Sequence, residues 1–171
     1  CAFCGVRTIE GPYRELKDWR PAPVICDSNF LACSDAHFNR VIDTLKRADF
    51  AEVDFNQGLD AALLTWERAQ RITELPLRPR FAWDKTSDER DVLNAVEFLE
   101  AAGMRCRASS PSSLSTALVR VYVLVGFRET QDEATYRMET LRDERLCPVA
   151  MRYQPLDAME RNAYCPPQWD R

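Results

Sequence analysis

The sequence predicts an α/β fold built on a parallel β-sheet, and three observations support this prediction. Short runs of apolar and β-branched residues, each long enough for one strand, occur five times in the 171 residues. Amphipathic stretches with helical spacing separate these runs, so predicted strands and helices alternate. Clear helix-start signals precede several of these stretches. Because parallel neighbours need a connection as long as a helix, the alternation favours parallel strands.

The first two strand and helix units lie in the N-terminal half. The first strand is expected at residues 23–27, and Ser34 is expected to cap the following helix. The second strand is expected at residues 51–55, and its helix begins near Thr65. The apolar stripes of these helices are Phe38, Val41, Ile42 and Leu45, and then Trp66, Ala69, Ile72 and Leu75.

The third unit has a strand at residues 80–83 and a helix that starts near Ser87 and stops at Gly103. The serine-rich residues 108–116 follow it. This composition cannot bury a core, so it predicts a flexible surface insertion.

The last unit consists of a strand at residues 119–125, a helix opened by the capping box Thr130 to Glu133, and a strand at residues 148–153. An open doubly wound sheet and a barrel-like arc both agree with this order. In either arrangement, binding sites form at the carboxyl ends of the strands.

Composition and charge narrow the class of protein. The chain is 46% hydrophobic with a net charge of −4, which suits one globular domain with a core. Basic residues are scattered, so a nucleic-acid partner is not indicated, although a local RNA contact stays open. No apolar run of about 18 residues and no signal peptide are visible, so we expect a cytoplasmic protein without a membrane partner.

The seven cysteines include a Cys-x2-Cys pair, Cys1 and Cys4. An odd number of cysteines makes a closed disulfide framework a poor explanation, and such a pair can serve zinc, an iron-sulfur cluster or dithiol chemistry. Zinc normally needs a second ligand pair, but the remaining cysteines are isolated and His37 lies in a predicted helix. A dithiol pair would be expected between a strand and a helix, whereas irregular sequence surrounds Gly5.

Cys1, Phe3 and Cys4 resemble the end of the cluster motif of the radical S-adenosylmethionine (SAM) enzymes, C-x3-C-x2-C with an aromatic residue before the last cysteine. The motif's first cysteine would lie four residues before Cys1. The resemblance implies a partial parallel β/α barrel whose first strand is missing, with residues 1–157 as the core fragment. Residues 158–171 would then begin a C-terminal extension.

The resemblance also implies the chemistry. Cys1 and Cys4 would be two of three thiolate ligands of a 4Fe-4S cluster that binds SAM at its open iron. One electron from a flavodoxin- or ferredoxin-type donor would cleave SAM to a 5′-deoxyadenosyl radical, which abstracts hydrogen from an unidentified substrate. A fragment that lacks one thiolate would itself be inactive.

The resemblance extends along most of the chain. The chain is also similar to uncharacterised phage- and bacterium-type radical SAM proteins, which carry a run like that from Asp54 to Asp60. Leu124, Gly126 and Glu129 match part of the family pattern G-x-I-x-G-x-x-E, with Tyr122 in place of the first glycine. The cofactor-binding residues that the resemblance implies are Phe3, Asp27, Ser28, Asn29, Asp54, Gln57, Asp60, Arg80, Asp84, Gly126, Glu129 and Met151.

A second interpretation belongs to a different class of protein. Cys1 and Cys4 could form part of a structural metal site or redox site in a module without catalytic activity. A second Cys-x2-Cys pair before Cys1 would favour this interpretation, whereas a single cysteine four residues before Cys1 would favour the enzyme.

Overall fold

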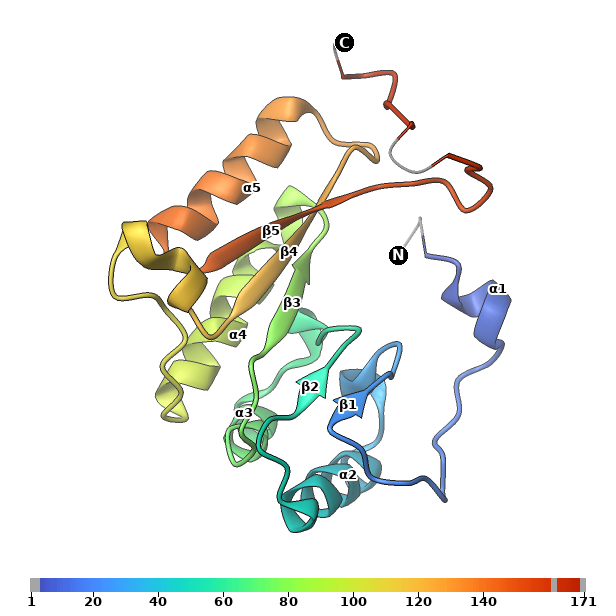
Figure 1. Cartoon of the computed structure of the whole chain (residues 1–171), viewed down its shortest axis with the longest axis vertical. Coiled ribbons are helices and arrows are strands. Elements are labelled where there is room, and N and C mark those ends of the chain that lie inside the picture. The colour runs from blue at the N-terminus through green and yellow to red at the C-terminus, as the bar shows by residue number, and fades with distance from the viewer. Residues whose placement is uncertain (1–3, 161–162, 170–171) are drawn as a thin grey trace.

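The computed structural model describes residues 4–160 and 163–169, and its strands alternate with helices along the chain (Figure 1). The strands are β1 Val24–Ile25, β2 Asp54–Phe55, β3 Arg80–Trp83, β4 Arg120–Val125 and β5 Cys147–Arg152. The α-helices are α1 Val6–Glu10, α2 Asp35–Ala48, α3 Trp66–Ile72, α4 Glu89–Ala101 and α5 Gln131–Asp143. Short 3-10 helices are η1 Phe30–Ala32, η2 Ala61–Leu63, η3 Thr86–Asp88 and η4 Pro111–Thr116.

The strands are parallel and form two small sheets, which confirms the predicted α/β class with parallel strands. One sheet pairs β1 with β2, and the other has the order β3-β4-β5. Two isolated parallel bridges, Val53 with Leu77 and Leu59 with Phe81, link the edges of the two sheets. The strands therefore follow one another in chain order, and the described residues do not form a closed barrel.

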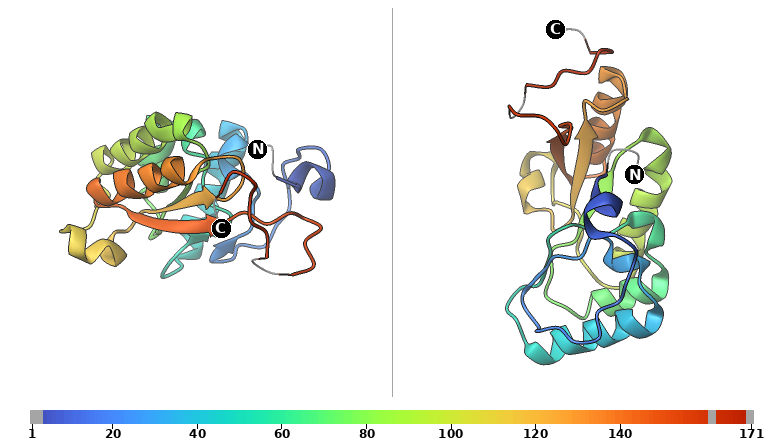
Figure 2. Two further views of the ribbon diagram at one scale, coloured as in Figure 1. Left: turned by 90° about the horizontal axis from the view of Figure 1, so that it is seen from above. Right: turned by 90° about the vertical axis from the view of Figure 1, so that its right-hand side faces the viewer.

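Helices α2 to α5 lie along one side of the sheets, while α1 and the segment after β5 lie near the carboxyl ends of the strands (Figures 1 and 2). The strands show the same asymmetry. Phe81 and Trp83 are fully buried, whereas Ala82 between them is exposed. The opposite side of the sheets, which helices α2 to α5 do not cover, is called the uncovered face below. Val24 on β1 and Met151 on β5 are 49% and 40% exposed.

The helices begin where the sequence predicts. Ser34 caps α2 by accepting the N–H of His37 at 3.2 Å, and Thr65 caps α3 in the same way. Thr130 and Glu133 form the predicted capping box of α5. Among the described residues, no helix is both long and apolar enough to cross a bilayer.

One apolar core joins the helices to the sheets. Its fully buried members include Phe81 and Trp83 on β3, Ile72 on α3, Leu99 on α4 and Leu141 on α5. These residues come from stripes that the helical and strand periodicities predicted, so burial of apolar area explains the order of the elements.

The first two strands are shorter than predicted. Only two residues of 23–27 and two of 51–55 form ladder pairs. Isolated cysteines such as Cys26 and Cys33 are expected to pack as small buried residues. Cys33 is buried, but Cys26 is exposed, so for Cys26 this expectation is wrong. Short pairing is physically reasonable here because Pro23 has no N–H to donate to a ladder.

The serine-rich residues 108–116 lie at the surface as predicted except at one residue, since η4 contains no buried residue. Ala108 is 3% exposed, so this segment does contribute to the buried interior. The segment then forms η4, in which Ser113 Oγ accepts the N–H of Ser110 at 3.2 Å. Serine hydroxyl groups thus form local hydrogen bonds with the backbone that stabilise this short helix.

We expect the substitution Leu99→Ala to lower the free energy of unfolding by about 2 to 5 kcal/mol, because it leaves a cavity in the core. Met159→Ala is the matched control, since that side chain is 98% exposed and its loss should change stability by less than about 0.5 kcal/mol. Urea denaturation followed by circular dichroism measures both. Equal effects of the two substitutions would contradict this description of the core.

Candidate functional site

Polar side chains link the carboxyl ends of β1 and β2. After β1, the Asp27 carboxylate accepts the N–H of Asn29 at 2.9 Å, which closes a local turn. The Asn29 side-chain amide donates to Asp60 Oδ2 at 3.1 Å. The other Asp60 oxygen accepts the N–H of Ala62 at 3.2 Å and caps η2. The structure therefore brings Asn29 and Asp60 together across two strand ends.

The turn after β2 approaches β3 closely. Gly58 has φ +83°, and a Cβ atom there would lie 3.3 Å from the carbonyl oxygen of Arg80. The N–H of Leu59 donates to that same carbonyl at 2.7 Å. Glycine thus allows the turn to meet β3, while Gln57 is exposed.

Asp54 and Arg80 do not lie at the carboxyl ends of their strands, so their predicted placement there is wrong. Each is the first residue of its strand, and Arg80 Nη2 donates to Asp54 Oδ2 at 2.6 Å. Their side chains are 26% and 23% exposed. β3 spans the predicted residues 80–83 and therefore begins at Arg80, and β2 is shortened to Asp54–Phe55 and therefore begins at Asp54.

A buried arginine organises the carboxyl ends of β3 and β4. Arg137 on α5 is 0% exposed and donates to the carbonyls of Trp83 at 2.7 Å and Leu124 at 2.9 Å. Its guanidinium lies 4.0 Å from the Glu129 carboxylate. Burial lowers the pKa of Arg137, and the negative charges of Glu129 and Asp84 oppose that shift. One cation therefore bridges two strand ends and a loop.

Glu129 and Gly126 form the loop after β4. The Glu129 carboxylate accepts the backbone N–H groups of Gly126, of Phe127 at 3.2 Å and of Arg128 at 3.1 Å. Gly126 has φ +84°, which a side chain would strain. Since Glu129 is already engaged by its own loop and lies beside Arg137, it holds the loop in shape.

Asp84 follows β3 at the same end of the sheet. Burial is the main cause that raises the pKa of this carboxyl group, Asp88 adds to the increase, and Arg137 opposes it. Sequence reasoning identified Asp84 and Glu129 but missed Arg137. A single arginine within a predicted amphipathic helix is normally interpreted as a surface residue. Only the position of Arg137 on the core-facing side of the helix would have indicated that it is buried.

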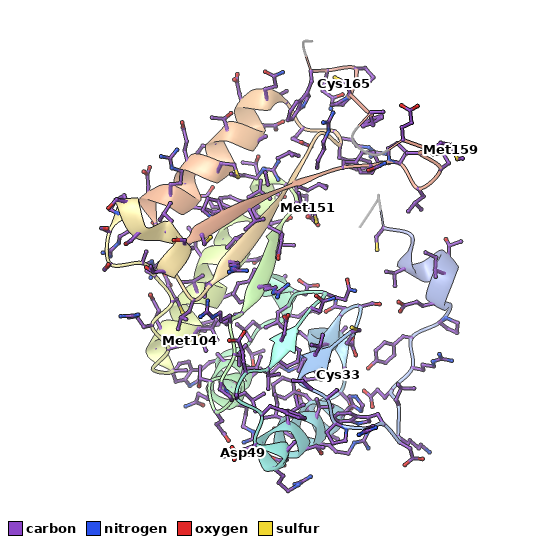
Figure 3. The ribbon with its side chains drawn as sticks, in the orientation of Figure 1. Cys33, Asp49, Met104, Met151, Met159 and Cys165 are labelled. Carbon is purple, nitrogen blue, oxygen red and sulfur yellow. The ribbon has the colours of Figure 1, made fainter. Side chains whose placement is uncertain are left out.

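The segment after β5 folds back over the loop after β4. Gln168 Nε2 donates to the carbonyls of Phe127 and Glu129, and Trp169 Nε1 donates to the Glu129 carbonyl at 2.9 Å. Tyr153 packs on Phe127 with ring centroids 4.7 Å apart. Met151 lies nearby on β5, opposite Leu124 in register (Figure 3). The loop after β4 is therefore covered by the C-terminal segment.

Residues 4–22 form an arm that two carboxylates hold against the sheets. Ser28 Oγ donates to Glu10 Oε2 at 2.7 Å, which attaches α1 to the turn after β1. Glu15 accepts the N–H of Ser34 at 2.7 Å and its hydroxyl at 3.1 Å, which attaches the arm to the start of α2. These bonds attach the arm, which contains the exposed Cys4, to the turn after β1 and to the start of α2.

The described residues test only part of the predicted metal site. Cys1 and Phe3 lie outside the described residues, and Cys4 is exposed and accessible. Within 4–160 and 163–169, no three His, Cys, Asp or Glu side chains are grouped so that they could hold a metal ion. Burial raises the pKa of the Cys33 thiol and raises that of Cys106 to about 12, which suits packing. Cys4 fits a thiolate ligand, but a complete ligand set is not formed by the described residues.

Comparison of the chain with protein-family models, with curated proteins and with solved structures gave no significant match.

Replacing Arg137 by Met should destabilise the protein by about 3 to 5 kcal/mol, because Glu129 would lose its buried cation and two carbonyls would lose their donor. Arg142→Met is the matched control on the same helix, since Arg142 is exposed, and it should stay within about 0.5 kcal/mol of the wild type. Chemical denaturation of the three proteins measures this. A fully stable Arg137→Met protein would show that the bridge is dispensable.

The attachment of the arm through Glu15 should be visible in its titration. Hydrogen bonds from the Ser34 N–H, the Tyr13 hydroxyl and the Ser34 hydroxyl lower the pKa of Glu15 to about 2. Since the folded pKa lies below the ordinary value, the stabilisation by Glu15 is complete above an ordinary glutamate pKa and is lost as pH falls toward 2.

Carbon-13 NMR of the Glu15 carboxyl measures this shift directly. We expect a midpoint near 2 in the wild type and a midpoint closer to the ordinary value in Ser34→Ala, which removes one of the hydroxyl donors. A normal glutamate midpoint in the wild type would mean that the arm is not held there in solution.

Proposed function

We propose that this chain is the core of a radical SAM enzyme in which Cys1 and Cys4 supply two of the three thiolates that hold a 4Fe-4S cluster. The third thiolate would come from residues before Cys1. The proposal includes the finer form of the fold, a partial parallel β/α barrel with its first strand outside this sequence. Parallel strands that follow one another in chain order, with their helices on one side, support that form.

The hydrogen bond between Ser28 and Glu10 is the observation that carries the proposal. It attaches the segment directly after the cysteine pair to the carboxyl end of β1, at 2.7 Å. In parallel α/β folds, ligands bind at the carboxyl ends of the strands. A cofactor held by Cys4 would therefore lie near the polar groups that follow the strands.

The residues that would bind SAM come from several strand ends. Asn29 and Asp60, joined at 3.1 Å, would face its charged amino acid part, together with Asp27 and Ser28. The loop at Gly126, held by Glu129 and Arg137, would present backbone groups to the adenine. Phe3, Gln57, Asp84 and Met151 remain part of the proposed binding surface, and Asp54 with Arg80 would face the substrate side.

When bound, the cluster would pass one electron from a flavodoxin- or ferredoxin-type donor to SAM, which yields methionine and a 5′-deoxyadenosyl radical that takes hydrogen from the substrate. The protein's own residues contribute binding and orientation. The C-terminal segment over Glu129 and the aromatic contact of Tyr153 with Phe127 would limit the access of water to the loop after β4.

Iron loading tests the ligand role of Cys4. We expect anaerobic reconstitution of the chain with its preceding motif residues restored to give a 4Fe-4S absorption band and about four irons per protein, since three thiolates hold such a cluster. Cys4→Ser should lose most of this iron, whereas Cys26→Ser should keep it because Cys26, although also exposed, lies outside the motif. Equal iron in both variants would exclude Cys4 as a ligand.

Activity tests the enzyme class. The loaded protein, incubated with SAM and dithionite, should form 5′-deoxyadenosine and methionine in equal amounts, measured by mass spectrometry. The Cys4→Ser protein is the negative control. Tight binding of one zinc ion through Cys4 without 5′-deoxyadenosine would instead identify the non-enzymatic metal-binding module.

A further inference from the structure

The uncovered face carries a group of charged and polar side chains at the amino ends of β3 and β4. Arg80 and Arg120 are paired in register on these neighbouring parallel strands, and Tyr122 lies two residues further along β4. Residues paired in register, and residues two apart on a strand, point to the same side of a sheet. Arg80 Nη1 lies 3.5 Å from the Tyr122 hydroxyl, which agrees with this placement.

The two arginines are not equally neutralised. Arg80 is paired with Asp54 at 2.6 Å. Among the described residues, Arg120 has neither an ion-pair partner nor a side-chain hydrogen bond. Like charges directly opposite on neighbouring strands repel each other. The group of Asp54, Arg80 and Arg120 thus has one positive charge in excess.

Asp54 contributes a second unsatisfied group. Its Oδ1 atom is shielded from solvent and accepts no hydrogen bond from any described residue. A shielded carboxylate oxygen without a donor is costly, since it has lost its water without replacing it. Arg120 therefore lacks an acceptor, and Asp54 Oδ1 lacks a donor. Arg80, which is paired with Asp54, lies on the strand next to that of Arg120.

We propose that this face binds a small oxyanion that also carries a hydroxyl hydrogen, such as hydrogen phosphate or a 2-hydroxycarboxylate. The oxygens of the anion accept from Arg120 and from the Tyr122 hydroxyl. A small movement of the side chains that cover Asp54 Oδ1 lets the O–H group of the anion donate to it. An anion without such a hydrogen would bring lone pairs against the carboxylate and be repelled. The site lies at the amino ends of β3 and β4 and shares Asp54 and Arg80 with the substrate side of the proposed enzyme, but anion binding there requires neither a cluster nor SAM.

The test compares three anions on the 171-residue protein at constant ionic strength: inorganic phosphate, L-lactate and sulfate. Arginine Nε–H signals in nitrogen-15 NMR spectra report binding at Arg80 and Arg120. Phosphate keeps an O–H group at neutral pH and lactate has its 2-hydroxyl, whereas sulfate has none. We expect phosphate, lactate or both to bind about fivefold or more tightly than sulfate, because only they can satisfy Asp54.

Three variants sharpen the test. Arg120→Gln should weaken the favoured anion about tenfold or more, as the loss of a charged hydrogen-bond donor does. Arg90→Gln, an exposed arginine on α4, should leave binding unchanged. Asp54→Asn replaces the lone acceptor by an amide that can donate, so it should remove or reverse the preference against sulfate. Circular dichroism and thermal unfolding show whether each variant is folded.

Several results would overturn the inference. These are no shift of the Arg80 and Arg120 signals with any of the three anions, equal binding of sulfate in the wild type, or equal weakening by Arg120→Gln and Arg90→Gln. Binding of lactate alone would assign the site to hydroxycarboxylates, and binding of phosphate alone to phosphate groups. Since none of these measurements uses iron or SAM, failure of the proposed enzyme activity would leave their outcome unchanged.

Discussion

The buried guanidinium of Arg137 is the interaction on which the carboxyl end of the larger sheet depends. It donates to the carbonyls of Trp83 and Leu124, where β3 and β4 end, and it lies beside Glu129. Glu129 in turn holds the loop after β4 through backbone N–H groups, and the C-terminal segment packs on that loop. One cation in the apolar interior therefore determines the shape of the loop and the position of the segment that covers it.

Carboxylates play the corresponding role on the N-terminal arm. Several apolar side chains of the arm are exposed, such as Ile9 at 77% and Tyr13 at 65%, while Trp19 packs against the core. Its position also depends on the hydrogen bonds of Glu10 with Ser28 and of Glu15 with Ser34, and on Arg40, which donates to the Leu16 carbonyl at 3.0 Å. Such an attachment is specific in geometry but weak in energy, because exposed hydrogen bonds compete with water.

The two faces of the sheets have different tasks. The face toward α2 to α5 is apolar and provides the stability through residues such as Phe81, Trp83 and Leu99. The uncovered face carries the ion pair of Asp54 with Arg80 and the unpaired Arg120, a poor choice of residues for stability alone. Alternation along β3 and β4 separates these tasks residue by residue, so that recognition and packing do not compete for the same side chains.

The sequence by itself determined the parallel α/β class, the start of α2 at Ser34, the capping box of α5 and the buried stripes, because periodicity and capping are local properties. It also located the polar residues that follow the strands, including Asn29, Asp60 and Glu129. Only the tertiary structure decided that Asp54 and Arg80 pair on the uncovered face and that Arg137 is buried under two strand ends. Those facts depend on register and on helix orientation, which arise from contacts between residues far apart in the chain and leave no local pattern in the sequence.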